Sequence, residues 1–105
     1  MNRAAIVAIA VIAGLGAGDA MAHEERLLIG RVERIDPGRR LLIVADGQGG
    51  ERRRIDVDTD TEVIVCRTGA PLMAIHAGAL VRVKYLDRPG AQPEAQSILV
   101  LGEAR

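Results

Sequence analysis

Residues 27–38 of the chain read Leu-Leu-Ile-Gly-Arg-Val-Glu-Arg-Ile-Asp-Pro-Gly, and this stretch decides the fold. An apolar segment over residues 27–35 followed by Asp-Pro-Gly predicts a strand that ends in a turn. Gly30 and Val32 share one side of that strand, whereas Ile35 has the opposite parity. If all three face a core, the strand must contain a β-bulge. Gly30 would then suit a strongly coiled strand that serves two faces of a small barrel.

The rest of the chain repeats this kind of element at close spacing. Short runs of Val, Ile and Leu are separated by Gly, Pro and Asp, which is typical of a small antiparallel barrel or sandwich. Along one run, apolar and basic side chains alternate, which places Val81, Val83 and Tyr85 in the core. A proline before residues 72–76 and a glycine after them predict a short helical turn there. Further strands are predicted over residues 40–44, 52–57, 62–66, 80–86 and 97–101.

The composition narrows the functional classes. The chain has 14 Lys and Arg residues against 14 Asp and Glu residues, so it is formally neutral. A neutral chain is poorly suited to capture nucleic acid or an anionic membrane. Tyr85 is the only aromatic residue, which disfavours stacking platforms for bases or sugars. Cys66 is the only cysteine, so no disulfide can form within the chain.

The N-terminus has the organisation of a secretory signal peptide. A basic residue precedes an uncharged apolar run over residues 4–17, and Ala20 and Ala22 provide the small side chains that signal peptidase requires. The run is shorter than the ~20 residues of a membrane-spanning helix, which favours cleavage over an uncleaved membrane anchor. We therefore predict a signal peptide over residues 1–22 and one exported domain over residues 23–105, periplasmic or secreted.

Several stretches of the chain together resemble a known type of exported domain. They are Gly30-Arg-Val32-Glu-Arg-Ile35-Asp36, Leu41-Leu-Ile43, Thr61-Glu-Val63, residues 72–78, Val81-Arg-Val83-Lys-Tyr85 and Ala95-Gln-Ser-Ile98-Leu-Val100. Over nearly all of the predicted mature chain they resemble small secreted bacterial OB-like barrels, a widespread family of exported domains of unknown function. More distantly, they resemble the periplasmic copper-binding chaperones of the CusF type.

This resemblance implies an all-β fold, a five- to six-stranded antiparallel OB-like barrel with one short helical turn. It does not imply a metal site. The copper chaperones of this shape hold Cu(I) and Ag(I) with Met, His and a capping Trp on the barrel strands. This chain has no Trp, and the segment after its second predicted strand, Ala45-Asp46-Gly47-Gln48, has no His. None of the family's ligands therefore carries over to a matching position.

Three soft or borderline metal ligands nevertheless lie close together in the sequence: Cys66, Met73 and His76. Thiolate, thioether and imidazole together suit Cu(I), so these residues form the candidate metal site if the fold brings them together. A structural role is favoured for Cys66, which continues the Val63-Ile64-Val65 run as a small buried residue that reacts slowly. An exposed Cys66 would instead allow an intermolecular disulfide. His23, at the predicted mature N-terminus, could chelate Cu(II) through its amine and imidazole.

Two charged runs also have functional and structural interpretations. Arg52-Arg53-Arg54 could bind an anion or a partner, but strand alternation splits it between two faces, which favours a solvated, charge-balanced surface. Asp56, Asp58 and Asp60 alternate as calcium ligands do, but the glycine and terminal glutamate of an EF-hand are missing. A strand end with neighbouring threonines explains these aspartates more simply.

No motif in the sequence predicts catalysis. The chain has no Ser-centred elbow, no His-Glu-x-x-His and no phosphate-binding loop. A domain of this size also has little room for a water-excluding pocket. The sequence therefore predicts an exported, non-catalytic binding or structural module of the bacterial cell envelope, without a cofactor. Such a module would present its barrel face or an edge strand to another envelope protein. The alternative is a periplasmic soft-metal protein that carries copper on Cys66, Met73 and His76.

Overall fold

The computed structural model describes residues 24–103, and the predicted signal peptide, its cleavage site and His23 lie outside this range. The strands are β1 (Glu24–Asp36), β2 (Leu41–Asp46), β3 (Arg52–Asp56), β4 (Glu62–Val65), β5 (Thr68–Ala70), β6 (Leu80–Asp87) and β7 (Glu94–Gly102). Two 3-10 helices join them, η1 (Pro37–Arg39) after β1 and η2 (Leu72–Ala74) after β5. Neither helix in the described range has the length or the hydropathy of a membrane span.

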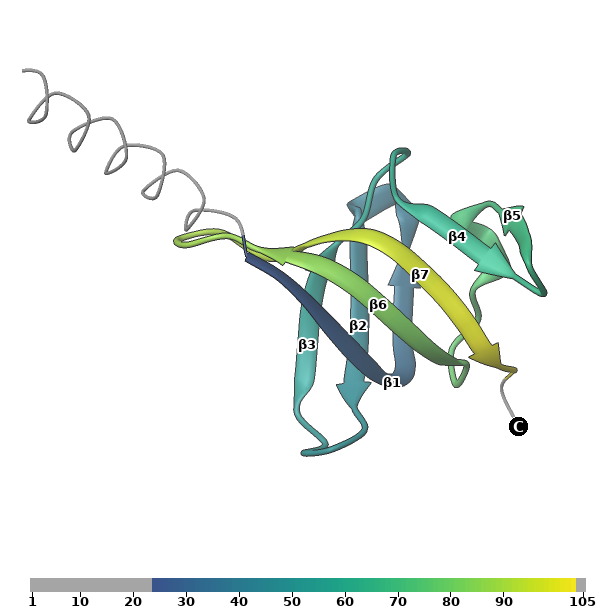
Figure 1. Ribbon diagram of the computed structural model, residues 1–105, viewed down its shortest axis with the longest axis horizontal. Coiled ribbons are helices and arrows are strands. Elements are labelled where there is room, and N and C mark those ends of the chain that lie inside the picture. The colour runs from purple at the N-terminus through teal and green to yellow at the C-terminus, as the bar shows by residue number, and fades with distance from the viewer. Residues whose placement is uncertain (1–23, 104–105) are drawn as a thin grey trace, which may run out of the picture.

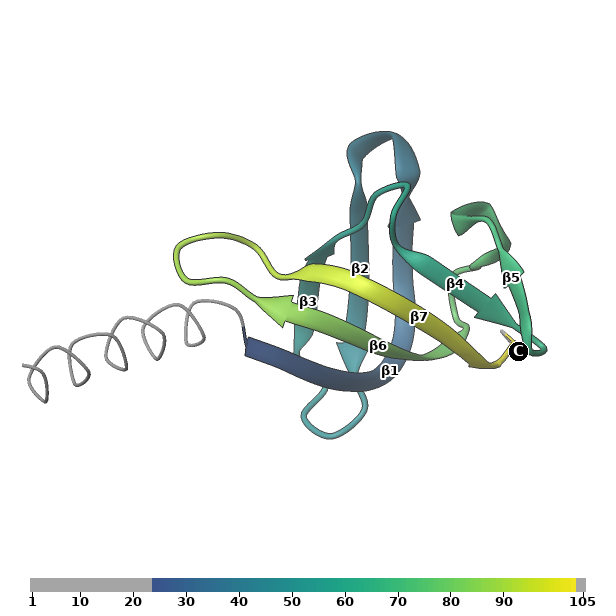
Figure 2. The same ribbon diagram turned by 45° about the horizontal axis from the view of Figure 1, so that its top comes forward.

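Five of the strands form a nearly closed ring in the order β3-β2-β1-β6-β7, and each neighbouring pair in this order is antiparallel. The ring closes through one parallel residue pair between β3 and β7, Asp56 with Glu94, where the Asp56 N–H donates to the Pro93 carbonyl at 2.8 Å. Figures 1 and 2 show β1, β6 and β7 side by side, with β2 and β3 crossing behind them. The fold is therefore an all-β, OB-type ring that is not quite a barrel.

The strands β4 and β5 extend the sheet beyond this ring. β4 pairs in parallel with β7, and β5 pairs antiparallel with the other side of β4. The prediction of five or six antiparallel strands is therefore correct for the ring and wrong for this extension. It assumed that β4 pairs with an antiparallel neighbour, whereas β4 lies beside the last strand of the chain. The Thr-Gly-Ala sequence of β5 gives no strand signal, because it has no apolar alternation.

β1 joins the two halves of the ring. Its first half pairs with β6, its second half pairs with β2, and its register against β2 shifts just after Val32. The predicted bulge is therefore present, and Ile35 beyond it packs against the core. Gly30 pairs with β2 on one side and with β6 on the other. A Cβ atom built there would stand 2.8 Å from Val44 Cγ1 and closer still to the Ala45 carbonyl oxygen, so only glycine lets β2 come this near.

The core fills the ring and contains the side chains that alternation predicts. Val81, Val83 and Tyr85 of β6 are buried, whereas Arg82 is exposed and Lys84 is half-buried. The facing strands and the segment after η2 complete the core. The largest side chains that they bury are Leu42, Ile55, Ile75 and Ile98.

The observed boundaries differ from the predicted ones mainly at strand ends. β1 begins at Glu24 and not at residue 27, because its charged start pairs with the end of β6. Arg26 stabilises this end with ion pairs to Glu24 (3.1 Å) and Asp87 (3.3 Å). The predicted helical turn is present as η2 but stops before Ile75, whose extended backbone carries its side chain into the core.

Candidate functional site

Cys66 lies in the turn between β4 and β5, where it is exposed. The expectation of a buried thiol is therefore wrong. Cys66 and Arg67 form a two-residue hairpin loop, because β4 ends at Val65 and β5 begins at Thr68. Both loop residues have positive φ, 53° and 68°, as type I′ hairpin turns require. The chain thus reverses immediately after Val65 and takes Cys66 out of the apolar run that precedes it.

Met73 and His76 are also exposed, but they follow β5 whereas Cys66 precedes it. Met73 lies in η2, and His76 lies in the turn before β6, where the Ala79 N–H donates to the His76 carbonyl at 3.1 Å. Strand residues advance ~3.3 Å each, so the hairpin tip stands roughly 10 Å from the far end of β5. The predicted copper ligands therefore lie on three separate segments. No three His, Cys, Asp or Glu side chains within residues 24–103 are arranged to hold a metal ion.

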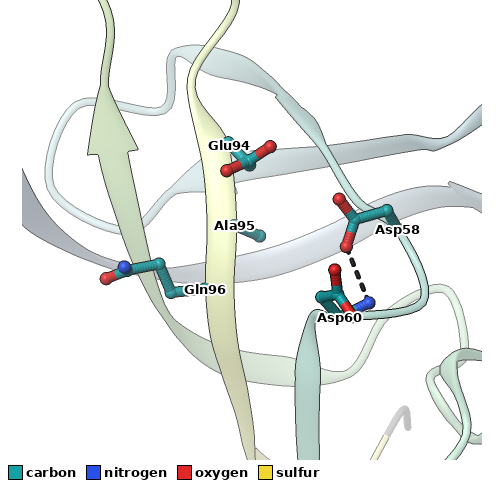
Figure 3. Close-up of a pocket in the computed structure, with 5 residues that line it drawn as sticks. All are labelled: Asp58, Asp60, Glu94, Ala95 and Gln96. Atoms are coloured by element: carbon teal, nitrogen blue, oxygen red, sulfur yellow. Dashed lines mark hydrogen bonds between the residues drawn. The ribbon is translucent and has the colours of Figure 1, made fainter. Parts of the chain in front are cut away.

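A hollow of about 370 Å³ lies where the turn after β3 meets β7. Figure 3 shows the residues that line it, which include two of the aspartates singled out from the sequence. The lining residues are Asp58, Asp60, Glu94, Ala95 and Gln96. In Figure 3, Gln96 points to the other side of β7 from the two aspartates. The hollow is thus open and acidic, and among the described residues its carboxylates do not form a group that could hold a metal ion.

The polar groups of this hollow stabilise the turn itself. Asp58 Oδ1 accepts a hydrogen bond from the Asp60 N–H at 2.8 Å. Thr61 Oγ1 accepts one from the Asp58 N–H at 3.0 Å and donates one to the buried Ala95 carbonyl at 3.0 Å. Side chains that satisfy nearby backbone groups in this way are characteristic of Asx turns. This network supports the structural interpretation of Asp58, with Thr61 as its main partner.

Arg52, Arg53 and Arg54 are all exposed on β3. Arg52 Nε lies 2.8 Å from a Glu33 carboxylate oxygen, and Arg53 lies 3.8 Å from Asp46. Apart from its single pair with β7, β3 has no neighbouring strand on its outer side within residues 24–103. Charged side chains on such an edge discourage association with other strands. Protection of the β3 edge therefore explains the three consecutive arginines, and no bound ligand is needed to account for them.

Large apolar side chains are exposed on the outward side of the β1, β6 and β7 sheet. Leu27 is 65% exposed, Ile29 50% and Leu101 47%. Arg82 of β6 lies in register between Ile29 of β1 and Leu99 of β7, and it makes no ion pair with the residues that the structure describes. We call this surface the outer face. It consists of Leu27, Ile29, Arg82, Lys84, Leu99 and Leu101.

The outer face is the feature that the sequence prediction missed. Leu28 and Gly30 are buried in β1, so the strand period of two turns Leu27 and Ile29 outward. That alternation is present in the sequence, but the uninterrupted Leu-Leu-Ile run conceals it. A continuous apolar run is typical of strands that are covered on both faces.

Two solved structures resemble this fold. A crystal structure of CusF with Ag(I) aligns with 73% of this chain and 97% of its own, with a TM-score of 0.53 and 16% sequence identity. A structure of CusF–Ag(I) residues 10–88 from Escherichia coli aligns with 75% of this chain and 94% of its own, with a TM-score of 0.55 and 15% identity. No protein-family model and no curated protein sequence matches the chain. The chain therefore shares the small OB-type fold of CusF.

Proposed function

We propose that the chain is an exported, non-catalytic binding module that docks another protein of the bacterial envelope against its outer face. The observation that carries the proposal is the exposure of Leu27, Ile29 and Leu101 on one surface. Apolar side chains gathered on the surface of a soluble domain mark interaction sites. The apolar N-terminal segment with its small residues supports export, and the absence of catalytic motifs in the sequence supports a binding role.

The apolar part of the outer face can contribute a useful share of a binding free energy. Full burial of a Leu or Ile side chain is worth about 1.5–3 kcal/mol. The exposed surface of Leu27, Ile29 and Leu101 adds up to that of somewhat more than one and a half fully exposed side chains. Covering them therefore contributes about 2–5 kcal/mol. A micromolar complex needs about 8 kcal/mol, so polar contacts must supply the remainder.

Arg82 provides the polar element of the outer face. Arg82 has an apolar register neighbour on each adjacent strand, Ile29 on β1 and Leu99 on β7, and it has no carboxylate partner among the described residues. A guanidinium in this position prefers a carboxylate that it can bind through two parallel hydrogen bonds. We therefore expect a partner surface on which aliphatic side chains surround an aspartate or glutamate.

Site-specific photocrosslinking tests this proposal in the intact bacterial envelope. A photoreactive residue at Ile29 should give a discrete adduct with another protein, because Ile29 lies on the outer face beside Arg82. The matched control is Glu33, which is also exposed on β1 but lies in the bulge, where the register against β2 shifts. The adduct from Ile29 should be lost when Arg82→Glu reverses the charge beside it.

Two outcomes would contradict the proposal. Equal adducts from Ile29 and Glu33 would show that contact is not specific to the outer face. An Ile29 adduct that survives Arg82→Glu unchanged would show that the complementary carboxylate does not exist.

A soft-metal carrier is the second candidate function. Two observations favour it: Cys66, Met73 and His76 are all exposed to incoming metal, and the chain shares its fold with CusF, whose solved structures contain Ag(I). The three ligands lie on separate segments, so binding would require the β4–β5 hairpin to move toward η2. This candidate predicts that Cu(I) stabilises the folded chain, because a ligand that binds only the native state raises its stability.

A further inference from the structure

The first half of β1 has an open edge. β1 pairs with β6 from Glu24 onward, but its pairing with β2 begins only at Gly30. On the β2 side, residues 24–28 therefore have no neighbouring strand among the described residues. An unpaired strand edge is a template for another strand, because its N–H and C=O groups lack partners.

The backbone groups that face this edge can be identified from neighbouring hydrogen bonds. The Gly47 N–H donates to the Ile29 carbonyl at 2.9 Å from the β2 side. Val32 is bonded from the opposite side, where its N–H donates to the Ala79 carbonyl at 2.9 Å. Successive strand residues direct their backbone groups to alternate edges, so Glu25 and Leu27 direct theirs to the open edge. Neither makes a backbone hydrogen bond on that side within residues 24–103.

A hollow of about 170 Å³ lies beside this edge. The apolar part of its lining comes from β1 and the polar part from the end of β2 and the loop after it. The lining residues are Leu27, Leu28, Ile29, Asp46 and Gln48. One long side chain of an added strand would fit such a space, with its stem on the apolar wall and a cationic head at Asp46.

We infer that the open edge of β1 binds an extended, basic and aliphatic peptide segment of the partner as an added strand. This inference rests on the proposed function and names its binding mode. Main-chain hydrogen bonds to Glu25 and Leu27 give affinity, and alternate side chains of the peptide give specificity. Aliphatic residues lie beside Leu27 and Ile29, and a lysine or arginine lies near Glu25 or Asp46.

The charges around the edges support this choice of site and ligand. The open edge of β3 is guarded by three consecutive arginines, whereas the β1 edge ends in the apolar sequence Leu27-Leu28-Ile29. The carboxylates near the β1 edge make only long ion pairs, and one oxygen of Asp46 also accepts a hydrogen bond from the Gln48 N–H at 2.9 Å. Glu25 lies 3.5 Å from Lys84, and Asp46 lies 3.8 Å from Arg53. A basic peptide is therefore matched to the β1 edge and repelled by the β3 edge.

A peptide segment fits this edge better than a second copy of the chain. The β2–β3 loop reaches the edge at Ile29, where Gly47 binds the carbonyl, so only about five residues can pair. Stable interfaces between folded proteins use about 20–30 residues on each side. A flexible strand needs only the edge itself.

The test uses the ¹⁵N-labelled protein and a synthetic peptide with the sequence Lys-Val-Thr-Val-Thr-Val. Binding should shift the Glu25 and Leu27 amide signals and slow their hydrogen exchange at least tenfold. The Leu28 and Gly30 amides, which face β6, should exchange as before. Two N-methylated peptides provide the matched control, one methylated on each set of alternate residues. One set directs its N–H groups to β1 and the other to solvent, so one peptide should lose at least tenfold in affinity and the other should bind normally.

A protein variant gives an independent readout. Leu27→Pro removes the N–H that faces the open edge and leaves the pairing with β6, as proline on an edge strand can do. It should abolish peptide binding, whereas Leu27→Thr should only weaken it. If Leu27→Pro does not fold, the comparison of the two N-methylated peptides still tests whether the peptide binds as an added strand.

Four results would overturn the inference. Equal binding of both methylated peptides would exclude strand addition. Peptide-induced shifts confined to β3 or β5 would place the site on another edge. Shifts of Glu25 and Leu27 that depend on protein concentration without peptide would indicate a second copy as the occupant. If the peptide fails to bind while the Ile29 crosslink persists, the strand-addition mode alone is refuted; loss of both refutes the proposed function as well.

Discussion

Replacement of Gly30 by alanine tests how this sequence builds the ring. The added Cβ would stand 2.8 Å from Val44 Cγ1, 2.9 Å from the Ala45 carbonyl carbon and nearer still to the Ala45 oxygen. Two of these atoms belong to the backbone of β2, which is itself paired on both sides and cannot yield alone. β1 and β2 must therefore separate where β1 passes from one partner strand to the other.

The size of the effect follows from this geometry. Overpacking of a tightly packed site costs about 1–3 kcal/mol, and each weakened ladder hydrogen bond adds about 1 kcal/mol. Alanine also lowers the conformational entropy of the unfolded chain relative to glycine, which stabilises the folded state by about 0.4–1 kcal/mol. With one such bond weakened, these terms give a net loss of about 1–4 kcal/mol. A domain of this size has a total stability of about 4–12 kcal/mol, so the variant should fold but be clearly less stable.

Urea unfolding followed by circular dichroism measures this loss, with the fluorescence of the buried Tyr85 as a second probe. The midpoint should fall by about 1–3 M while the slope stays the same. Gly69→Ala is the control, because nothing lies within 4 Å of the Cβ it would add. It should change stability by no more than about 0.5 kcal/mol. If Gly30→Ala is as stable as this control, the close approach of β2 does not require glycine and the explanation of the coiled strand is refuted.

Three further predictions follow from the turns. Cys66 is exposed, so a thiol-reactive dye should label the folded protein about as fast as the urea-unfolded one; labelling only after unfolding would contradict its placement. Arg67 has a φ of 68°, so Arg67→Gly should raise the free energy of unfolding by about 1 kcal/mol, whereas a decrease would argue against the type I′ turn. Thr61→Val removes the hydroxyl that joins Asp58 to the buried Ala95 carbonyl, and it should destabilise the domain by about 1–3 kcal/mol. An unchanged urea midpoint for this last variant would show that the network carries no stability.

The strands of the ring are predicted well because the sequence patterns that specify them are local. The alternation around Val81, Val83 and Tyr85 determines which face of β6 is buried, and it is confirmed. The parity change between Val32 and Ile35 predicts the bulge, which is present. Both features depend only on the period of a strand and on a few neighbouring residues.

The features that the sequence does not predict depend on tertiary contacts or on turn geometry. β4 pairs with β7 across more than thirty residues of sequence, and no local pattern specifies that partner. The apolar run before Cys66 suggests a strand that continues through it, but a hairpin of two non-glycine residues interrupts that run. Such turns are usually recognised by Asn-Gly or Asp-Gly, and Cys66-Arg67 lacks that signature.

The candidate site is hidden for a related reason. Leu27 and Ile29 have the composition of core residues, and only the burial of Leu28 and Gly30 shows that they face outward. The open edge of β1 arises because β2 pairs with it only from Gly30 onward, which depends on the tertiary arrangement of the ring. By contrast, the soft ligands Cys66, Met73 and His76 are conspicuous in the sequence, yet the fold places them on separate segments.

The claim that the domain acts through its outer face and not through a soft metal is tested most directly by a melting curve. The protein is heated with and without excess Cu(I) under reducing conditions, beside a Cys66→Ser variant. Metal held at a hundred times its Kd would stabilise the fold by about 2.7 kcal/mol, which corresponds to roughly 10–20 °C for a domain of this size. We predict no change in Tm for either protein. A rise of this size in the wild type that disappears in Cys66→Ser would contradict the account and establish the copper site.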